Sequence, residues 1–488
     1  MKKRAILFYV TLFLLILTYS LTTNKFDNDL WARLIAGMGV IDGGHVLTQD
    51  FLSYTPVHTW WDHEWGAGVV FYAFLKFFGP FSLIILQAFM LFGILFTASK
   101  VIKIKNPEPY NILIYFFVLM SVMQNLNNPI RCHMFSFLFF TIFIYILEKV
   151  RQGKSKLLFI IPPFILLWNN IHGGVVAGLG LLGMYALGEF LNKKPFKNYL
   201  ITFGISALAM FINPWGCDYI KFLLMANTMK RPEIVEWWGL FAKYNMFRYL
   251  IYKIFILVIG IVEFLQVKKS SWEKLDKTKY IVLLVTLYLG ISHVKLLPFF
   301  AISALCYCYD DFYKVIPVWK DKLICIILLC VSIFTLTVKD FSIPVGIDMY
   351  PVKEVEFIKQ NNLTGKILVD FNYGSFVSYK LYPHNLIFMD GRYEEVYYDY
   401  MVPLLKEFSL ANKNWRQLLL YFPPDVMILE NKYPIYDVLK SEKEWALVYE
   451  GKSFGVFVPE KQSHKKFKKP TDDLNYYKKT LFDTDIKF

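Results

Sequence analysis

The sequence has few cysteines and none in a metal-binding pair. Its six cysteines include no C-x-x-C spacing, and Cys306, Cys308, Cys325 and Cys330 lie in or beside apolar segments. Structural zinc sites and disulfide frameworks need clustered cysteines at characteristic spacings. Neither kind of stabilising site is therefore expected.

The sequence also lacks a signal-peptide cleavage motif and internal repeats, and it has few charged residues. No small-x-small motif follows the first apolar run, "AILFYVTLFLLILTYSL", so we expect a retained helix and not a removed signal peptide. The sequence shows no internal repeat, and charged residues make up only 19% of the chain. The repeat architectures, and transporters built from inverted repeats, are therefore not favoured.

Apolar residues are abundant instead. They make up 56% of the 488 residues, against about 45–50% in globular proteins. Several runs approach the roughly 20 residues that cross a bilayer, which predicts a polytopic α-helical membrane protein with about eleven transmembrane helices. The runs are 5–21, 82–99, 110–124, 134–147, 157–168, 173–191, 198–212, 249–266, 279–291, 297–309 and 322–337.

The net charge of +14 is distributed as in a membrane protein. From Lys339 onward basic and acidic residues are equal in number, so the excess lies between the apolar runs, and nucleic acid is not an expected partner. Loops such as "EKVRQGKSK" and "QVKKSSWEKLDKTK" are rich in lysine. The positive-inside rule then predicts a plasma-membrane protein with its N-terminus inside and its C-terminal region outside. The run "EWGAGVVFYAFLKFFG" is interpreted as an interfacial helix, because counting it as a span would reverse the later loops.

Three regions follow from this pattern. Residues 1–338 are expected to form the transmembrane domain, with a large first external loop at 22–81. Residues 339–460 are expected to form an external α/β domain, since "GKILVDF", "NLIFMD" and "DVMILE" resemble buried strands and "WALVYEGKSFGVFV" a hairpin. Residues 461–488 are expected to be a basic, flexible tail.

The predicted outer ends of the spans carry unusual polar residues. Such residues are costly at a membrane border unless they line a cavity or pair, so we expect one external polar cavity. They are Asp27, Asp29, His63, Glu64, Arg131, His133, Asn169, Asn170, His172, Asn213, Glu236, His293 and Lys295.

The first loop has the densest pattern. "DLWARLIAGMGVIDGG" places apolar residues at helical spacing and ends on two glycines, which predicts an amphipathic helix on the membrane surface. Asp27 and Asp29 stand at its start, where an aspartate can also be an ordinary helix cap. The same loop continues with "WWDHEW".

An Asp pair after the first span, a helix of the form D-x-W-x-x-L-x-x-G and a second polar patch about 30 residues later resemble the GT-C superfamily of membrane glycosyltransferases. The group includes aminoarabinose transferases and protein O-mannosyltransferases, which use polyprenyl-phosphate-linked sugars. The resemblance implies a glycosyltransferase of the cell envelope, with Asp29 as catalytic base and Asp27 as its partner. The chain departs from aminoarabinose transferases in having "WWDHEW" where they have Lys-Pro-Pro-Leu. It lacks WWDYG, which argues against the oligosaccharyltransferase branch.

Glycosyl transfer needs a carboxylate beside the acceptor hydroxyl and cations on the leaving phosphate. Asp29 suits the first task, and Arg131 and Lys295 suit the second, although both could simply snorkel to lipid headgroups. A divalent cation, Mg or Mn, on Asp27 and Asp29 is an optional cofactor. The further substrate-binding candidates are His63, Glu64, His133, His172, Glu236 and Arg392, the last of which could instead pair with Glu394.

The expected partners are a polyprenyl-phosphate-sugar donor, membrane lipids and a glycan, lipid or protein acceptor. Two other classes of function stay open: a transporter or flippase of lipid-linked intermediates, and a non-catalytic scaffold with a GT-C-like fold. Because the unusual polar residues gather on one predicted face and not at mid-bilayer, the transporter is less favoured. An Asp29→Asn variant would separate the enzyme from the scaffold.

Overall fold

The computed structural model describes residues 2–22, 26–125, 130–313, 321–338 and 350–488. Parts of two predicted loops, "QNLNNPIRCH" and "YDDFYKVIPVWKDK", and the predicted domain boundary at residue 339 lie outside the described residues. The chain forms two compact units. We call residues 1–23 and 84–340 the helical unit, and residues 24–83 and 341–488 the sheet unit.

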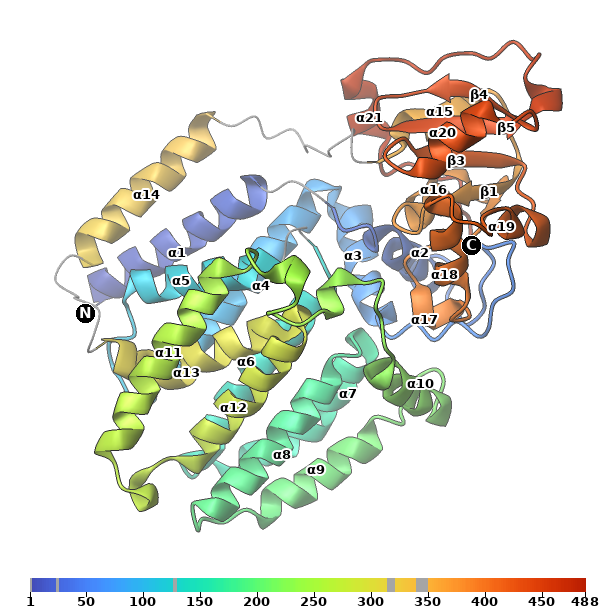
Figure 1. Ribbon diagram of the computed structural model, residues 1–488. Helices are drawn as coiled ribbons and strands as arrows, with labels where there is room; N and C mark the ends of the chain where they lie inside the picture. Colours follow the sequence, from blue (N-terminus) through green and yellow to red (C-terminus); the bar gives the residue numbers. More distant parts are fainter. Residues whose placement is uncertain (1, 23–25, 126–129, 314–320, 339–349) are drawn as a thin grey trace. The chain divides into compact units, whose positions relative to one another are not determined.

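Each of the eleven apolar runs contains a helix (Figure 1). Among the described residues, five helices are long and apolar enough to cross a membrane: α1, α4, α6, α11 and α14. The helices of this unit are α1 (Lys2–Thr22), α4 (Phe81–Ile102, here from Ile84), α5 (Ile112–Asn125), α6 (His133–Arg151), α7 (Ile161–Ile171), α8 (Val175–Leu191), α9 (Lys197–Ala209), α10 (Cys217–Thr228), α11 (Leu250–Lys269), α12 (Lys277–Ser292), α13 (Leu297–Tyr313) and α14 (Asp321–Val338).

Aromatic contacts and buried ion pairs hold the helical unit together. Phe8 of α1 packs edge-on against Tyr115 of α5, with ring centroids 4.9 Å apart. At the end of α6, the Arg151 guanidinium pairs with Glu148, Glu189 and Asp276 at 2.8–3.0 Å. The loops at this end of the helices are rich in lysine. Carboxylates gather around Arg151 nevertheless, because a buried arginine must be neutralised.

The sheet unit contains one five-stranded mixed sheet in the order β2-β1-β3-β5-β4. β1 runs parallel to β2 and to β3, with Ile367 opposite Ile387 and Val426, while β5 is antiparallel to both β3 and β4. The segments predicted to be strands form these five strands. They are β1 (Gly365–Val369), β2 (Asn385–Ile387), β3 (Val426–Glu430), β4 (Trp445–Glu450) and β5 (Phe454–Pro459).

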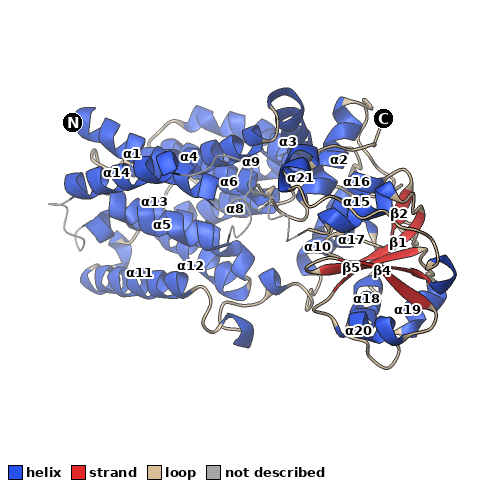
Figure 2. Ribbon diagram, turned by 90° about the horizontal axis from the view of Figure 1, so that it is seen from above, coloured by secondary structure: helices blue, strands red, loops and turns tan. Residues whose placement is uncertain are grey.

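Helices cover both faces of this sheet. Figure 2 shows α15 and α16 on one side of the strands and α18, α19 and α20 on the other. This follows from the strand order, since right-handed crossovers in opposite directions from β1 to β2 and back to β3 place their helices on opposite faces. The helices are α2 (Leu30–Ile41), α3 (Trp65–Phe78), α15 (Val352–Gln360), α16 (Gly374–Leu381), α17 (Tyr393–Val396), α18 (Met401–Ser409), α19 (Arg416–Tyr421), α20 (Pro434–Ser441) and α21 (Leu474–Thr480).

The long first loop belongs to the sheet unit. The backbone of Leu52 and Tyr54 hydrogen-bonds to Ile387 on β2, at 2.9 and 3.0 Å. Trp31 of α2 is fully buried against Phe376 and Tyr379 of α16. The helix predicted to lie amphipathically on a membrane surface is instead buried along most of its length, where Arg33 pairs with carboxylates and Trp31 packs against aromatic rings.

The helices α2 and α3 pack unusually closely. A Cβ atom at Gly37 would lie 2.3 Å from the carbonyl oxygen of Gly68, and one at Gly68 would lie 2.4 Å from that of Arg33. Glycine is therefore needed at both positions for the two backbones to approach. α3 has 14 residues, which corresponds to about 21 Å at 1.5 Å per residue.

The C-terminal segment expected to be a flexible tail is folded onto the sheet unit. Tyr477 and Leu481 of this segment are buried, and the Lys380 ammonium of α16 donates to the Thr480 carbonyl at 2.7 Å. Phe467 packs against Phe357 at 5.4 Å. The prediction of a flexible tail was wrong because apolar residues stand between the lysines of this segment, and these apolar residues pack onto the sheet unit.

Candidate functional site

The helical unit contains a small basic pocket of about 20 Å³, room for one water molecule or one ligand oxygen. Its polar walls come from loops beside the helices. Arg131 precedes α6, and Lys295 lies in a 3-10 turn between α12 and α13. Its lining residues are Arg131, His133, Phe137, Glu236, Tyr249, Val294 and Lys295.

Arg131 and Glu236 face each other in two parallel hydrogen bonds. The guanidinium Nη1 and Nη2 donate to the two carboxylate oxygens at 3.0 and 2.9 Å. The Arg131 side chain is 14% exposed and that of Glu236 is 37% exposed. Because an exposed carboxylate contributes little to a salt bridge, another oxyanion of the same geometry can compete for the guanidinium.

Trp237 organises the cations beside this pair. Lys295 Nζ lies 5.0 Å from the centre of its ring, and the Arg231 guanidinium lies 4.4 Å from it. The Trp237 carbonyl lies 2.7 Å from His293 Nδ1. Arg231 is buried and was not singled out from the sequence. Cation–π contacts hold both side chains without cancelling their positive charge.

Two residues at the edge of the pocket have unusual backbone conformations. Ile130, directly before Arg131, has φ +59°, and Tyr249, which precedes α11 and lines the pocket, has φ +55°. This left-handed region is costly for non-glycine residues, most of all for a β-branched one. Such conformations concentrate at functional sites, where a side chain must be held in a set direction.

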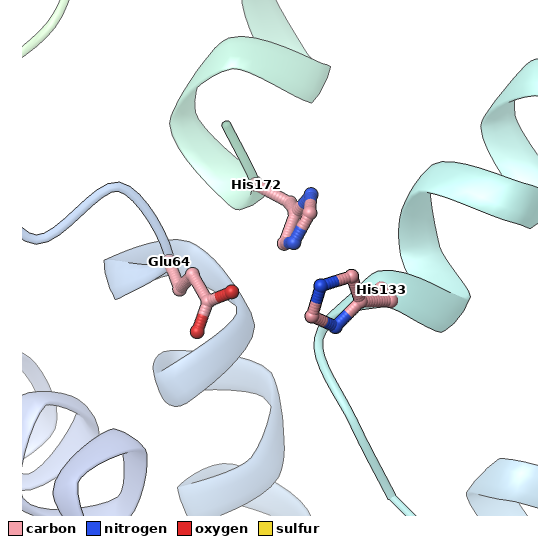
Figure 3. Close-up of side chains that lie close together, drawn as sticks. All are labelled: Glu64, His133 and His172. Atoms are coloured by element: carbon pink, nitrogen blue, oxygen red, sulfur yellow. The ribbon is translucent and has the colours of Figure 1, made fainter. Parts of the chain in front are cut away.

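His133 and His172 lie side by side, with ring centroids 4.9 Å apart (Figure 3). The Gly174 backbone N–H donates to His172 Nδ1 at 2.9 Å, and Ser136 Oγ lies 2.7 Å from the same nitrogen. Nδ1 must therefore be an acceptor, which leaves the proton of a neutral ring on Nε2. A ring held in this tautomer donates from Nε2 and does not offer that nitrogen to a metal.

The asparagines of the predicted polar face satisfy backbone carbonyls. Asn169 and Asn213 both donate to the Met210 carbonyl at the end of α9, at 3.1 and 2.8 Å. Asn170 donates to Ile212 at 2.9 Å. The side-chain amides of these three residues therefore satisfy backbone carbonyls at a helix end.

The sheet unit contains a different cluster, centred on Arg33 of α2. Its guanidinium pairs with Asp62, donates to Glu395 at 2.8 Å and lies 3.4 Å from Glu64. His63 Nδ1 lies 2.8 Å from the other oxygen of Glu395. The Arg33 side chain is only 3% exposed. Three carboxylates therefore enclose one buried guanidinium and one imidazole.

The charges in this cluster shift each other's pKa. Burial raises the pKa of Asp62 to about 7, against the attraction of Arg33. Burial opposes a charge on His63, but the charge and hydrogen bond of Glu395 raise its pKa to about 9. Burial likewise opposes ionisation of Glu395, yet Arg33 and His63 keep its pKa below the usual range. His63 is thus held as a cation that balances the excess of carboxylates.

Part of this cluster has metal-like spacing. Ligand atoms of His63, Glu64 and Glu395 lie within 4.8 Å of one another. However, Arg33 contacts both carboxylates from a buried position, so a divalent cation there would meet a fixed positive charge. The donor set therefore fits the guanidinium better than a metal ion.

Asp27 and Asp29 also lie in the sheet unit. Asp29 precedes α2 without a side-chain cap hydrogen bond. A Cβ atom at Gly391 would lie 2.2 Å from Asp29 Oδ1, so this carboxylate reaches the glycine of "DGRYEE". Asp27 is buried, and its Oδ1 accepts from the Asp29 N–H at 3.3 Å. The optional metal on this pair remains a prediction.

Arg392 does not occupy the position expected of a substrate-binding residue. Its side chain is fully buried, and Nε donates to Asp390 at 2.9 Å. Asp50 pairs with Nη1, and the Tyr397 hydroxyl lies 3.2 Å from Nη2. Among the described residues Glu394 is not one of its partners. A charge this deeply buried needs neutralisation on every side, so Arg392 ties the first loop to the sheet unit.

The predicted site residues thus fall into two groups. Arg131, His133, Glu236 and Lys295 share the basic pocket of the helical unit, with His172 next to His133. The aspartate pair, His63, Glu64 and Arg392 lie in the sheet unit. Five residues of these clusters were not predicted to be site residues from the sequence: Arg33, Asp62, Glu395, Arg231 and Trp237. A single arginine inside the apolar run "LWARLIAGM" was the available signal for the first of these.

A comparison of the chain with protein-family models and a search of curated proteins both found no match.

Proposed function

We propose that the protein is a membrane glycosyltransferase that moves a sugar from a polyprenyl-phosphate donor to a hydroxyl acceptor on the external face of the plasma membrane. In this proposal all eleven apolar helices cross the membrane, the N-terminus lies inside and the sheet unit lies outside. The observation that supports it most is the basic pocket, because its cations stand at the ends of apolar helices, where a lipid-linked phosphate is held.

The phosphate of the donor is assigned to Arg131 and Lys295. Its oxygens replace the exposed Glu236 carboxylate on the guanidinium fork, since phosphate and carboxylate share the bidentate geometry. His172, as an Nε2–H donor, and His133 beside it contribute neutral hydrogen bonds. This arrangement stabilises the negative charge that grows on the leaving phosphate.

The acceptor is assigned to Asp29. Its carboxylate takes the proton of the acceptor hydroxyl while that oxygen forms a bond to C1 of the sugar. The bond between C1 and the phosphate oxygen breaks on the opposite face, and its electron pair stays on polyprenyl phosphate. The sugar configuration is therefore inverted. His63 is the candidate for a sugar hydroxyl, because its side chain is 23% exposed in an otherwise closed cluster.

The test is turnover of a panel of polyprenyl-phosphate sugars by the purified protein, measured as released polyprenyl phosphate. Asp29→Asn should lower the rate on the order of 10²–10⁴-fold, the cost of losing a general base, while binding of polyprenyl phosphate is retained. Asp399→Asn, an exposed carboxylate in the same unit, is the matched control. Full activity in Asp29→Asn would remove this residue from catalysis, and loss of activity with a chelator would support the optional metal.

Topology is tested separately. Reporter fusions at residues 270 and 400 should report the inside and the outside, respectively. The same side for both would contradict the proposed arrangement of spans.

A further inference from the structure

A large apolar depression of the helical unit lies between α11 and α12. It encloses about 500 Å³, many times the roughly 30 Å³ that a water molecule occupies. Its walls include Ile259 and Phe264 of α11, Ile281 and Leu284 of α12, and Phe300 of α13. Phe264 and Leu284 are also exposed on the surface of the unit. The groove therefore opens sideways from helices that are apolar on their outer faces.

One end of this groove contains a buried lysine. Lys277, the first residue of α12, lines it and is 7% exposed. Its Nζ donates to the Glu273 carbonyl at 3.3 Å and lies 5.4 Å from the Trp272 ring. Within the described part of the chain no carboxylate lies within 4.0 Å of this ammonium.

The neighbouring Lys279, on the same helix, differs from Lys277 because carboxylates of the protein neutralise its charge. Its Nζ lies 2.7 Å from Glu263 and 3.0 Å from Asp311. Glu263 also lines the groove, but Lys279 already balances its charge. A buried ammonium is costly without an anion. The groove thus offers one positive charge at its end and apolar walls beyond it.

The dimensions match one leaflet of a bilayer. The lining residues of α12 run from Lys277 to Leu287, a rise of about 15 Å at 1.5 Å per residue, which is half of the roughly 30 Å hydrocarbon core. The last turn of α11 contains Lys268 and Lys269, and the segment that follows it contains Lys274 and the exposed Trp272. Lysines and tryptophan are typical of headgroup depth.

We propose that this groove binds one chain of an anionic phospholipid and that the lipid's phosphate lies on Lys277. The site differs from the basic pocket, since Lys277 begins α12 whereas Lys295 follows its last residue. It belongs to the leaflet at the lysine-rich end of the helices. The proposal does not depend on the proposed glycosyl transfer.

The experiment measures phospholipid retained by the full-length protein. Protein relipidated with equal amounts of phosphatidylglycerol and phosphatidylcholine is transferred to detergent, and bound lipid is counted by native mass spectrometry. The wild type should retain phosphatidylglycerol in preference. Lys277→Gln should lower this retention roughly tenfold, the effect of one charge-assisted hydrogen bond. Lys274→Gln removes the same charge at an exposed position in the turn before α12 and should have no effect.

A second pair of variants tests the groove itself. A Cβ at Gly260 of α11 meets nothing within 4 Å, so Gly260→Leu can fold while it fills the lipid's space, and it should lower retention of both lipids. Gly204→Leu, at an equally open position on α9, is the control. Unchanged retention in Lys277→Gln or in Gly260→Leu would overturn the proposal. Displacement of the lipid by free glycerol phosphate at equal concentration would also overturn it, because the headgroup alone would then suffice.

Discussion

The two charged clusters use arginine in opposite ways. In the sheet unit, Arg33 is enclosed by three carboxylates and is almost inaccessible. In the helical unit, Arg131 pairs with the partly exposed Glu236 and shares an open pocket with Lys295. The first cluster has more negative than positive groups, and the second has more positive groups. The partners of an arginine, and not its presence, therefore decide whether its charge is neutralised inside the protein or can reach another oxyanion.

The largest effect is expected from Arg33→Met. Removing one partner of a buried ion pair leaves the others uncompensated and costs about 3–5 kcal/mol, a large part of the stability of a typical domain. We expect the sheet unit to unfold at growth temperature, measured by protein yield and thermal unfolding. Adding Asp62→Asn and Glu395→Gln to the variant should restore part of the stability. An Arg33→Met protein as stable as the wild type would show that the cluster is not structural.

The matching change in the other cluster is Arg131→Gln. We expect normal folding and a 10- to 100-fold weaker affinity for polyprenyl phosphate, on the order of 1.5–3 kcal/mol for hydrogen bonds to a charged group. Glu236→Gln should have the opposite effect, because it removes the competing carboxylate. Binding is measured by titration in detergent, with Lys221→Gln as an exposed control. Weaker binding of polyprenyl phosphate in Glu236→Gln would contradict the proposal that the phosphate replaces the Glu236 carboxylate on Arg131.

The two units also differ in the space around their helical glycines, which alanine substitutions can test. Gly68→Ala forces its Cβ against the Arg33 carbonyl and should destabilise the protein by about 1–3 kcal/mol, as overpacking does. Gly204→Ala in α9 meets nothing and should be neutral or slightly stabilising. Thermal unfolding of both variants checks this. Equal unfolding temperatures would mean that α2 and α3 do not need their close approach.

The smallest effect concerns pH. His63 has a pKa raised from 6.5 to about 9 in the folded protein, so its stabilising charge is fully present below the unfolded value and is lost as pH rises toward 9. Between pH 7 and 9.5 the wild type should lose stability on the order of 1 kcal/mol, the partly exposed ring being screened by solvent. In His63→Gln the loss should be smaller. His45→Gln, at an exposed histidine, should behave as the wild type does.

The helices and strands of this fold could be predicted from the sequence, whereas the charged clusters could be predicted only in part. The apolar runs and the strand "DVMILE" depend on local patterns, and each forms the expected type of element. Arg131 and Lys295 could be grouped because the loop pattern places them at the same end of the spans. Arg33 could not be assigned, since its partners Asp62 and Glu395 are 29 and 362 residues away. Only the tertiary fold brings those charges together.

The sheet unit is assembled from two stretches of chain, 24–83 and 341–488, with the whole segment from Ile84 to Asp340 between them. A ribosome adding roughly 5–20 residues per second needs on the order of tens of seconds to make that segment. During this interval α2 has emerged, but the strands and Glu395 that complete its surroundings do not yet exist. Newly made protein therefore passes through a period in which α2, an apolar helix with a buried arginine, lacks the residues of the sheet unit that surround it in the folded protein. Chaperones that shield such segments would act on it during this period.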